Sequence, residues 1–173
     1  MSRLIERLGL QDRLRKGNVS RYILQCGLAG MVVLLLLLIL DALTQTVLIA
    51  ALGASAFIAF AVPRSLHSGP RSMIGGYLVG IVAGALMETL SASFQLADPI
   101  IAHAVMVLFG ALATGSAMFV MVITKTEHPP AAALALGLVL NEWDLLTLAV
   151  VITGIVALSM IKRLVLPLLM DLL

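Results

Sequence analysis

The residues best suited to bind a ligand lie in a polar stretch, 124–133, that interrupts an otherwise apolar sequence. Pro129 and Pro130 lack backbone donors and cannot continue a helix, and His128 before them is biased toward an extended conformation. We predict that a new helix opens at Pro130, because proline suits the first helical position. The first free N–H groups of that helix belong to three small residues, Ala131, Ala132 and Ala133. Bare amides at the positive end of a helix bind anions, so the stretch predicts an anion site.

Five side chains are candidates to complete or serve this site. His128 offers a ring donor that can change charge near neutral pH. The hydroxyls of Ser55, Thr124 and Thr126 could donate beside it, and Arg71 could attract anions to the inner mouth. Each also has a structural alternative: locking the helix break for His128, close helix packing for Ser55, local backbone bonding for the threonines, and topology anchoring for Arg71.

The sequence indicates no catalytic or metal centre. Glu127 and His128 do not belong to an H-E-x-x-H motif, and no second histidine lies at ligand spacing. The single Cys26 fits no metal motif and cannot form an intrachain disulfide. No nucleophile is accompanied by an identifiable base. We therefore expect a protein that is not an enzyme and that uses no metal or cofactor.

Composition points to a membrane protein. Of the 173 residues, 61% are hydrophobic and 12% are charged, about half the charged share of a soluble domain. We predict a basic cytoplasmic leader over residues 1–20, as a helix on the membrane surface or as a frayed segment, and a single transmembrane domain over residues 21–173. Beside a membrane span, the basic leader is better explained by topology or lipid headgroups than by nucleic acid.

The apolar segments predict an all-α polytopic fold with five or six transmembrane helices. They run over Tyr22–Leu40, Thr46–Val62, Ser72–Leu90, Ile100–Ile123, Ala131–Leu140 and Leu145–Ile161. The segment 131–140 is shorter than the roughly 20 residues that a full span needs. We predict two broken helices, one interrupted at Gly53-Ala54-Ser55 and one at the double proline, whose irregular backbone faces a cavity.

Small residues predict one close helix contact. Gly76, Gly80 and Gly84 follow one another at four-residue spacing. This pattern places them on one helix face and lets another backbone approach closely. The face also offers a surface for a further copy of the chain, so we expect a homo-oligomer.

Charge predicts the topology. The basic leader places the N-terminus in the cytoplasm, and the basic loop 64–71 and Lys125 then fall on the same side. The link 88–98 carries acids without Lys or Arg and falls outside. Lys162 and Arg163 place the C-terminus inside as well, which requires six crossings. We expect an integral protein of the bacterial inner membrane with both termini cytoplasmic.

Six crossings divide into two halves of three spans. The breaks at Gly53 and at His128 then occupy corresponding positions, and an odd number of spans makes the halves inverted. Interrupted helices at matching places indicate the binding site of a transporter. A 3+3 inverted repeat would bring both helix starts to one cavity near the membrane midplane. The expectation rests on span order and breaks, because no residue-level repeat is evident.

The motif residues resemble those of the HPP family of small integral membrane proteins. They are Thr124, His128-Pro129-Pro130, Gly53-Ala54-Ser55-Ala56, Pro70-Arg71, Gly75-Gly76 and Gly80. The resemblance covers most of residues 46–140. It implies four spanning helices and transport and, through plastid and cyanobacterial members, nitrite as the substrate. Here alanines follow the tripeptide where glycine is common in the family, and Lys125 and Glu127 place charges beside it, which bears on pocket size and selectivity.

These observations together predict a transporter of a small inorganic anion, nitrite above all, acting as a carrier or as a channel. The alternative is a membrane scaffold or regulator. A scaffold would explain the glycine face and the basic leader, but not a polar break at membrane depth. The expected partners are the anion, membrane lipid and further copies of the chain, with no nucleic acid.

Overall fold

The computed structural model describes residues 19–40, 46–94 and 97–172, and the regular elements in these ranges are all helical. In chain order they are α3 (Val19–Leu40), α4 (Thr46–Ala61), the 3-10 turn η1 (Leu66–Ser68), α5 (Pro70–Ala92), α6 (Pro99–Thr124), α7 (Pro129–Leu140), α8 (Leu145–Val165) and the 3-10 turn η2 (Leu166–Leu168). The all-α expectation is confirmed. The leader predicted for residues 1–20 lies outside the described residues except for its last two, which already belong to α3.

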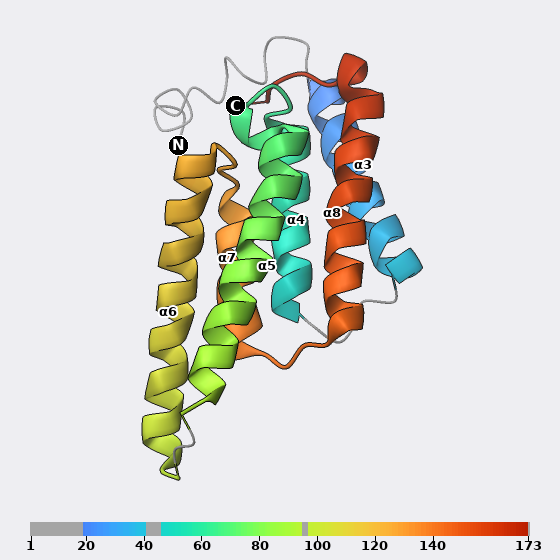
Figure 1. Cartoon of the computed structure of the whole chain (residues 1–173). Coiled ribbons are helices and arrows are strands. Elements are labelled where there is room, and N and C mark those ends of the chain that lie inside the picture. The colour runs from blue at the N-terminus through green and yellow to red at the C-terminus, as the bar shows by residue number, and fades with distance from the viewer. Residues whose placement is uncertain (1–18, 41–45, 95–96, 173) are drawn as a thin grey trace, which may run out of the picture.

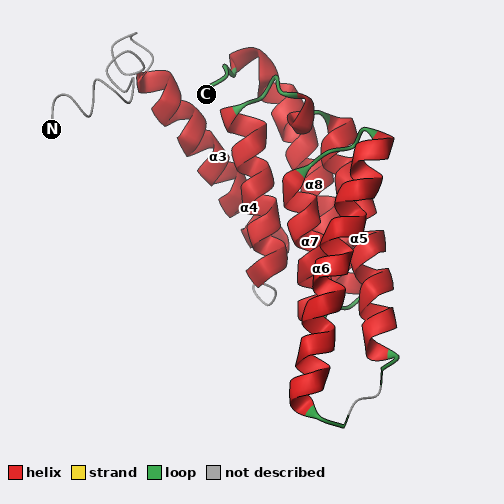
Figure 2. Cartoon of the chain, turned by 90° about the vertical axis from the view of Figure 1, so that its left-hand side faces the viewer, coloured by secondary structure: helices red, strands yellow, loops and turns green. Residues whose placement is uncertain are grey.

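The six α-helices run alternately up and down, and α7 lies within the bundle (Figure 1). α7 packs against α4, α5 and α6, while α8 packs against α4 and α5. α3 slants away from the other helices and contacts mainly α4 (Figure 2). The lower ends of α5 and α6 project beyond the rest of the bundle in both views.

Helix length distinguishes full spans from partial ones. Three helices are long and apolar enough to cross a membrane: Pro70–Ala92, Pro99–Thr124 and Leu145–Leu168. The resemblance implied four spans, and the remaining apolar stretches are shorter: Ile23–Leu35 within α3, Ala50–Ala61 within α4, and α7. At about 1.5 Å per residue, α7 is roughly 18 Å long and α8 roughly 32 Å. α7 is therefore the predicted half-helix, and its start lies beside Gly76 in the second turn of α5.

The break before α7 arises from local chain chemistry. α6 ends in a left-handed residue, Lys125, at φ 55° and ψ 47°. The N–H of Thr126 then donates to the carbonyl of Met121 at 2.9 Å, which closes a Schellman turn around the non-glycine residue. His128 is extended, as predicted, and α7 opens at Pro129, one residue before the predicted start.

The predicted break at Gly53 is wrong. α4 continues as a helix through Gly53-Ala54-Ser55 to Ala61. A single glycine costs a helix only about 1 kcal/mol relative to alanine, which tertiary packing overrides. The Ser55 hydroxyl also bonds to the carbonyl of Ala51, one turn earlier, at 2.9 Å, so it is accommodated inside the helix. The predicted interruption that the described residues do show is the 125–128 link, where the long α6 ends and the short α7 begins.

The glycine face of α5 lies directly against α7. A Cβ atom built on Gly84 would stand 2.8 Å from the carbonyl oxygen of Ala135, and one on Gly76 would stand 2.7 Å from Cβ of His128. The predicted close backbone approach is confirmed, and its partner is a helix of the same chain. This face is consequently not available to a second copy, which removes the reason given for a homo-oligomer.

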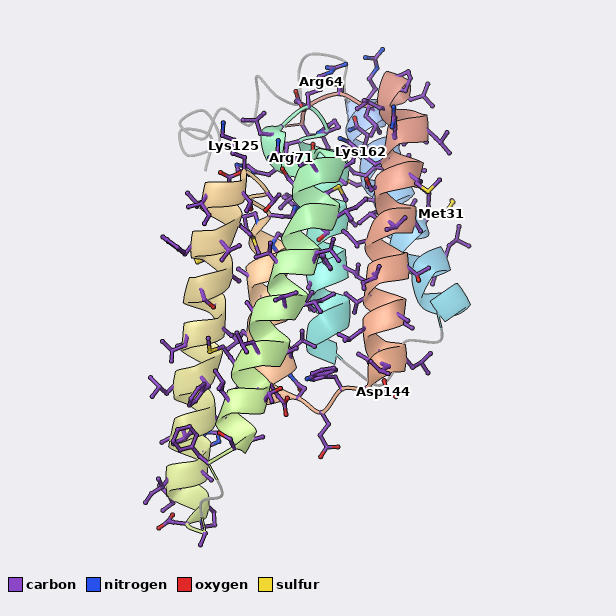
Figure 3. The ribbon with its side chains drawn as sticks, in the orientation of Figure 1. Met31, Arg64, Arg71, Lys125, Asp144 and Lys162 are labelled. Carbon is purple, nitrogen blue, oxygen red and sulfur yellow. The ribbon has the colours of Figure 1, made fainter. Side chains whose placement is uncertain are left out.

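Basic residues gather at one end of the molecule. Arg64, Arg71, Lys125 and Lys162 lie at the upper end in Figure 3, whereas Asp144 lies at the opposite end. We call the upper end the basic end. This distribution places the 64–71 loop, Lys125 and Lys162 on one side, as the charge pattern predicted. Which side faces the cytoplasm stays a prediction.

Candidate functional site

Three buried polar side chains meet where α4, α5 and the start of α7 cross. Ser55 Oγ lies 2.8 Å from the Tyr77 hydroxyl and 2.8 Å from His128 Nε2. Ser55 and Tyr77 are 0% exposed, and His128 is 1% exposed. We call these three residues the polar cluster. Because burying a polar group is unfavourable unless it is hydrogen-bonded, their mutual bonds explain how they are tolerated among apolar helices.

Small residues bring the three helices close enough for the cluster to form. Ala51 and Ala59 lie one turn before and after Ser55 on the buried face of α4. Gly76, next to Tyr77, makes room for the Cβ atom of His128. As a result the rings of Tyr77 and His128 stand 5.7 Å apart, in a tilted arrangement.

The second ring nitrogen of His128 is held by the backbone. Nδ1 lies 2.9 Å from the carbonyl oxygen of His67. A carbonyl can only accept, so Nδ1 carries a proton and donates it. The ring of His67 in turn donates from Nδ1 to the carbonyl of Glu127 at 3.0 Å. These two bonds join the 62–69 loop to the 125–128 link in both directions.

Two cationic side chains extend this polar structure at the basic end. Lys162 is only 5% exposed. Its ammonium group donates to the carbonyl of Ser68 at 2.8 Å and lies 3.2 Å from the Ser68 hydroxyl. Arg71, which is exposed, donates from Nη2 to the carbonyl of Thr124 at 2.8 Å. α8 is thereby tied to the 62–69 loop, and α5 is tied to the end of α6.

Of the predicted binding side chains, the structure brings together Ser55 and His128. The hydroxyls of Thr124 and Thr126 bond to each other at 2.8 Å instead. Thr124 also bonds to the carbonyl of Val120 at 2.7 Å, and Thr126 packs against Gly75. Both threonines serve the local backbone turn, and Arg71 lies above them at the basic end rather than in the cluster.

The amides at the start of α7 are not bare, contrary to expectation. Its first two positions are Pro129 and Pro130, which have no N–H. The first available amide, of Ala131, donates to the carbonyl of His128 at 2.9 Å. Ala132 and Ala133 follow within the helix, where His128 and Pro129 supply the acceptors four residues back. With no helix start in α4 either, two dipole ends do not converge here, and the donors left for a ligand are side chains.

Sequence reasoning missed Tyr77 and Lys162. Tyr77 adjoins Gly76 on the helix that carries the glycine face, and a phenol inside an apolar span calls for a hydrogen-bond partner. Lys162 was assigned only to the membrane boundary, yet its side chain is buried. An ionisable group within a spanning helix is itself a signal of a functional or pairing role.

Two apolar grooves in the described part of the bundle lie away from the cluster. One, of about 520 Å³, runs between α3 and α4 and includes Gly30, Gly53 and Phe57 in its wall. The other, of about 350 Å³, lies between α5 and α6 and includes Val82 and Val120. Neither is lined by Ser55, Tyr77 or His128, so the cluster is closed in the present conformation.

Comparison with known proteins supports the membrane assignment. The family model described as HPP, transmembrane region, matches residues 15–170. A protein described as a transmembrane protein of Dictyostelium discoideum is 35% identical over 101 residues, which cover 56% of this chain and 31% of that relative's length. No solved structure matches the chain. Since the family match covers nearly the whole chain, this integral membrane protein belongs to the HPP family.

Proposed function

We propose that this protein transports a small inorganic anion, nitrite foremost, across the membrane. The observation that carries the proposal is the polar cluster, in which a histidine and two hydroxyls are fully buried between apolar helices. Ionisable groups within spanning segments mark substrate or ion pathways more often than they stabilise the fold. The cluster also lies at the start of a half-helix, where irregular backbone is tolerated only against protein or a cavity.

The chemistry of the cluster suits an anion. The Ser55 hydroxyl lies within hydrogen-bond distance of both the Tyr77 hydroxyl and His128 Nε2, so two hydroxyl donors and, on protonation, one ring donor are grouped together. An oxyanion that replaces their mutual bonds would accept all three donors. The carrier mode follows from the closed cluster, because a solute can reach it only after the helices move. Nitrite as the substrate rests on the resemblance to HPP members associated with nitrite transport.

The basic end would favour entry of such an anion. Arg71 and Lys125 are exposed there and carry positive charge. Like charges around an opening raise the local concentration of an oppositely charged solute. They thus attract the anion without forming part of the buried site.

Uptake of nitrite, nitrate and formate into proteoliposomes of the purified protein tests the proposal. We expect saturable nitrite uptake by the wild type. His128→Ala should remove one hydrogen bond to a charged ligand, which contributes roughly 1.5–3 kcal/mol. The apparent affinity for nitrite should therefore fall about ten- to a hundredfold. His103→Ala is the matched control, since His103 is exposed on α6 away from the cluster. If the wild type moves none of the three anions, or if His128→Ala takes them up normally, the proposal is wrong.

A further inference from the structure

We infer that the polar cluster binds one proton together with each anion, on Nε2 of His128, so that the solute crosses without net charge. The inference rests on the proposed transport function and adds the coupling ion. It follows from counting the protons that the observed contacts require.

The cluster contains four short polar contacts. His128 Nδ1 reaches the His67 carbonyl at 2.9 Å, and His128 Nε2 reaches Ser55 Oγ at 2.8 Å. Ser55 Oγ also reaches the Ala51 carbonyl at 2.9 Å and the Tyr77 hydroxyl at 2.8 Å. Each contact needs its own proton to be a hydrogen bond.

A neutral imidazole leaves this network one proton short. The available protons are then those of His128 Nδ1, the Ser55 hydroxyl and the Tyr77 hydroxyl. The His67 carbonyl takes the first and Ser55 Oγ accepts the third. The single Ser55 proton must choose between the Ala51 carbonyl and His128 Nε2, so one of these short contacts is left without a bond.

A proton on Nε2 completes the network without any movement of heavy atoms. Nε2–H then donates to Ser55 Oγ, whose second lone pair accepts from Tyr77. The Ser55 proton is released to the Ala51 carbonyl. Protonation of His128 Nε2 would therefore satisfy all four contacts, whereas the neutral ring satisfies three of them.

That positive charge has no counter-ion among the partners of His128. Both ring nitrogens face neutral groups, a backbone carbonyl and a hydroxyl. The charged or titratable groups on the surrounding elements are Arg64 and His67 on the 62–69 loop, Arg71, Tyr77 and Glu88 on α5, Lys125 and Glu127 on the α6–α7 link, and Lys162 and Arg163 on α8. Glu127 offers the His67 ring its backbone carbonyl.

The nearby cations make a lone imidazolium unfavourable. Lys162 bonds to Ser68, which adjoins the residue that accepts from His128 Nδ1. A buried charge is costly unless an opposite charge is close. An anion in the cluster supplies that charge, and the proton supplies the third donor to the anion. Each therefore favours binding of the other, and the pair is electrically neutral. The proton comes from water on the entry side and leaves with the anion on the other.

Proteoliposomes allow the coupling to be measured apart from transport itself. Nitrite uptake is followed at a series of external pH values and at membrane potentials set with potassium and valinomycin, and uptake by protein-free liposomes is subtracted. For the wild type we expect the apparent nitrite affinity to rise roughly tenfold per pH unit of acidification above the pKa of His128, the slope of one bound proton. Uptake should be independent of potential.

His128→Gln is the informative variant, because a neutral amide can donate without binding a proton. We expect its nitrite uptake to lose the pH dependence and to follow the membrane potential. His103→Gln, on the exposed surface of α6, should behave as the wild type. Tyr77→Phe removes a donor but keeps Nε2, so its affinity should fall while its pH dependence persists.

The outcomes separate the two proposals. Wild-type uptake that follows the potential and ignores pH would overturn proton coupling and leave anion transport standing. Absence of uptake of nitrite, nitrate and formate would overturn both. If His128→Gln does not fold, a loss of pH dependence in Tyr77→Phe would still contradict the assignment of the proton to His128.

Discussion

At the scale of single residues, Ser55 holds the site together. Its one hydroxyl contacts side chains from two other elements and the backbone of its own helix. Tyr77 contributes less to the hydrogen-bond network, because its hydroxyl contacts Ser55 alone among the side chains of the described structure. Removing the central group should therefore disturb more partners than removing a peripheral one.

We expect Ser55→Ala to destabilise the protein more than Tyr77→Phe. Tyr77→Phe loses one hydrogen bond, with a net value of about 1 kcal/mol. Ser55→Ala leaves both Tyr77 and His128 Nε2 without a buried partner, at about 1–3 kcal/mol for each unsatisfied group. The free energy of unfolding is measured by reversible unfolding in detergent micelles. The double variant is measured as well, so that a double-mutant cycle gives the coupling between the two residues. Equal losses in the two variants, or strictly additive ones, would show that Ser55 is not the centre of the network.

The sequence predicted two of the three residues of this cluster. Ser55 and His128 were identifiable because each sits at a visible irregularity in an apolar run. Tyr77 was not, because its role depends on how α5 is rotated toward α4 and α7, and helix rotation is set by packing rather than by local sequence. The same holds for Lys162, whose flexible side chain folds inward to reach Ser68.

At the scale of elements, proline and glycine differ in how strongly they break a helix. Two prolines remove donors whatever surrounds them, so the break before α7 was predictable to within one residue. One glycine perturbs a helix weakly, so neighbouring helices decide its effect, and α4 remains whole. For this reason the prediction of two half-helices was wrong. The prediction that backbone amides from both would bind the anion was wrong as well.

The contact between α5 and α7 depends on the absence of side chains at the glycine face. We expect Gly80→Leu to abolish folding or cut the folded yield severely, because even a Cβ atom there would collide with the carbonyl of Ala131. Gly115→Leu on α6 is the matched control, since nothing lies within 4 Å of its Cβ position. Folded yield is measured by size-exclusion chromatography of a fluorescent fusion. A normal yield of Gly80→Leu would mean that α5 and α7 do not pack in this way.

At the scale of the whole molecule, the packing pairs agree with two inverted halves. In two such halves, α3 would correspond to α6, α4 to α7 and α5 to α8. The α5–α7 contact would then correspond to α8–α4, and the α6–α7 contact to α3–α4. Both members of each pair are present, and α4–α7 and α5–α8 map onto themselves. The halves are unequal in detail, since α6 packs closely and α3 slants away (Figure 2). The inverted repeat stays a prediction from the span order, and the slant of α3 has no counterpart in the sequence.

The six-helix arrangement predicts that the C-terminus is cytoplasmic. Lys162 and the chain that follows it lie at the basic end, and positive charge favours the cytoplasmic side. A C-terminal green fluorescent protein should therefore fluoresce, and a C-terminal alkaline phosphatase should be inactive. A reporter inserted at Glu142, at the opposite end of α8, should show the reverse pattern. Phosphatase activity at the C-terminus would contradict the count of six crossings.

The hydrogen bonds at the basic end bear on how the protein moves. His67, Arg71, His128 and Lys162 each donate to a main-chain carbonyl on another segment. Three of these bonds begin or end in the 62–69 loop, and the fourth joins α5 to the end of α6. Because the three bonds share one short loop, any movement of that loop strains them together, and we expect them to break together when this end opens.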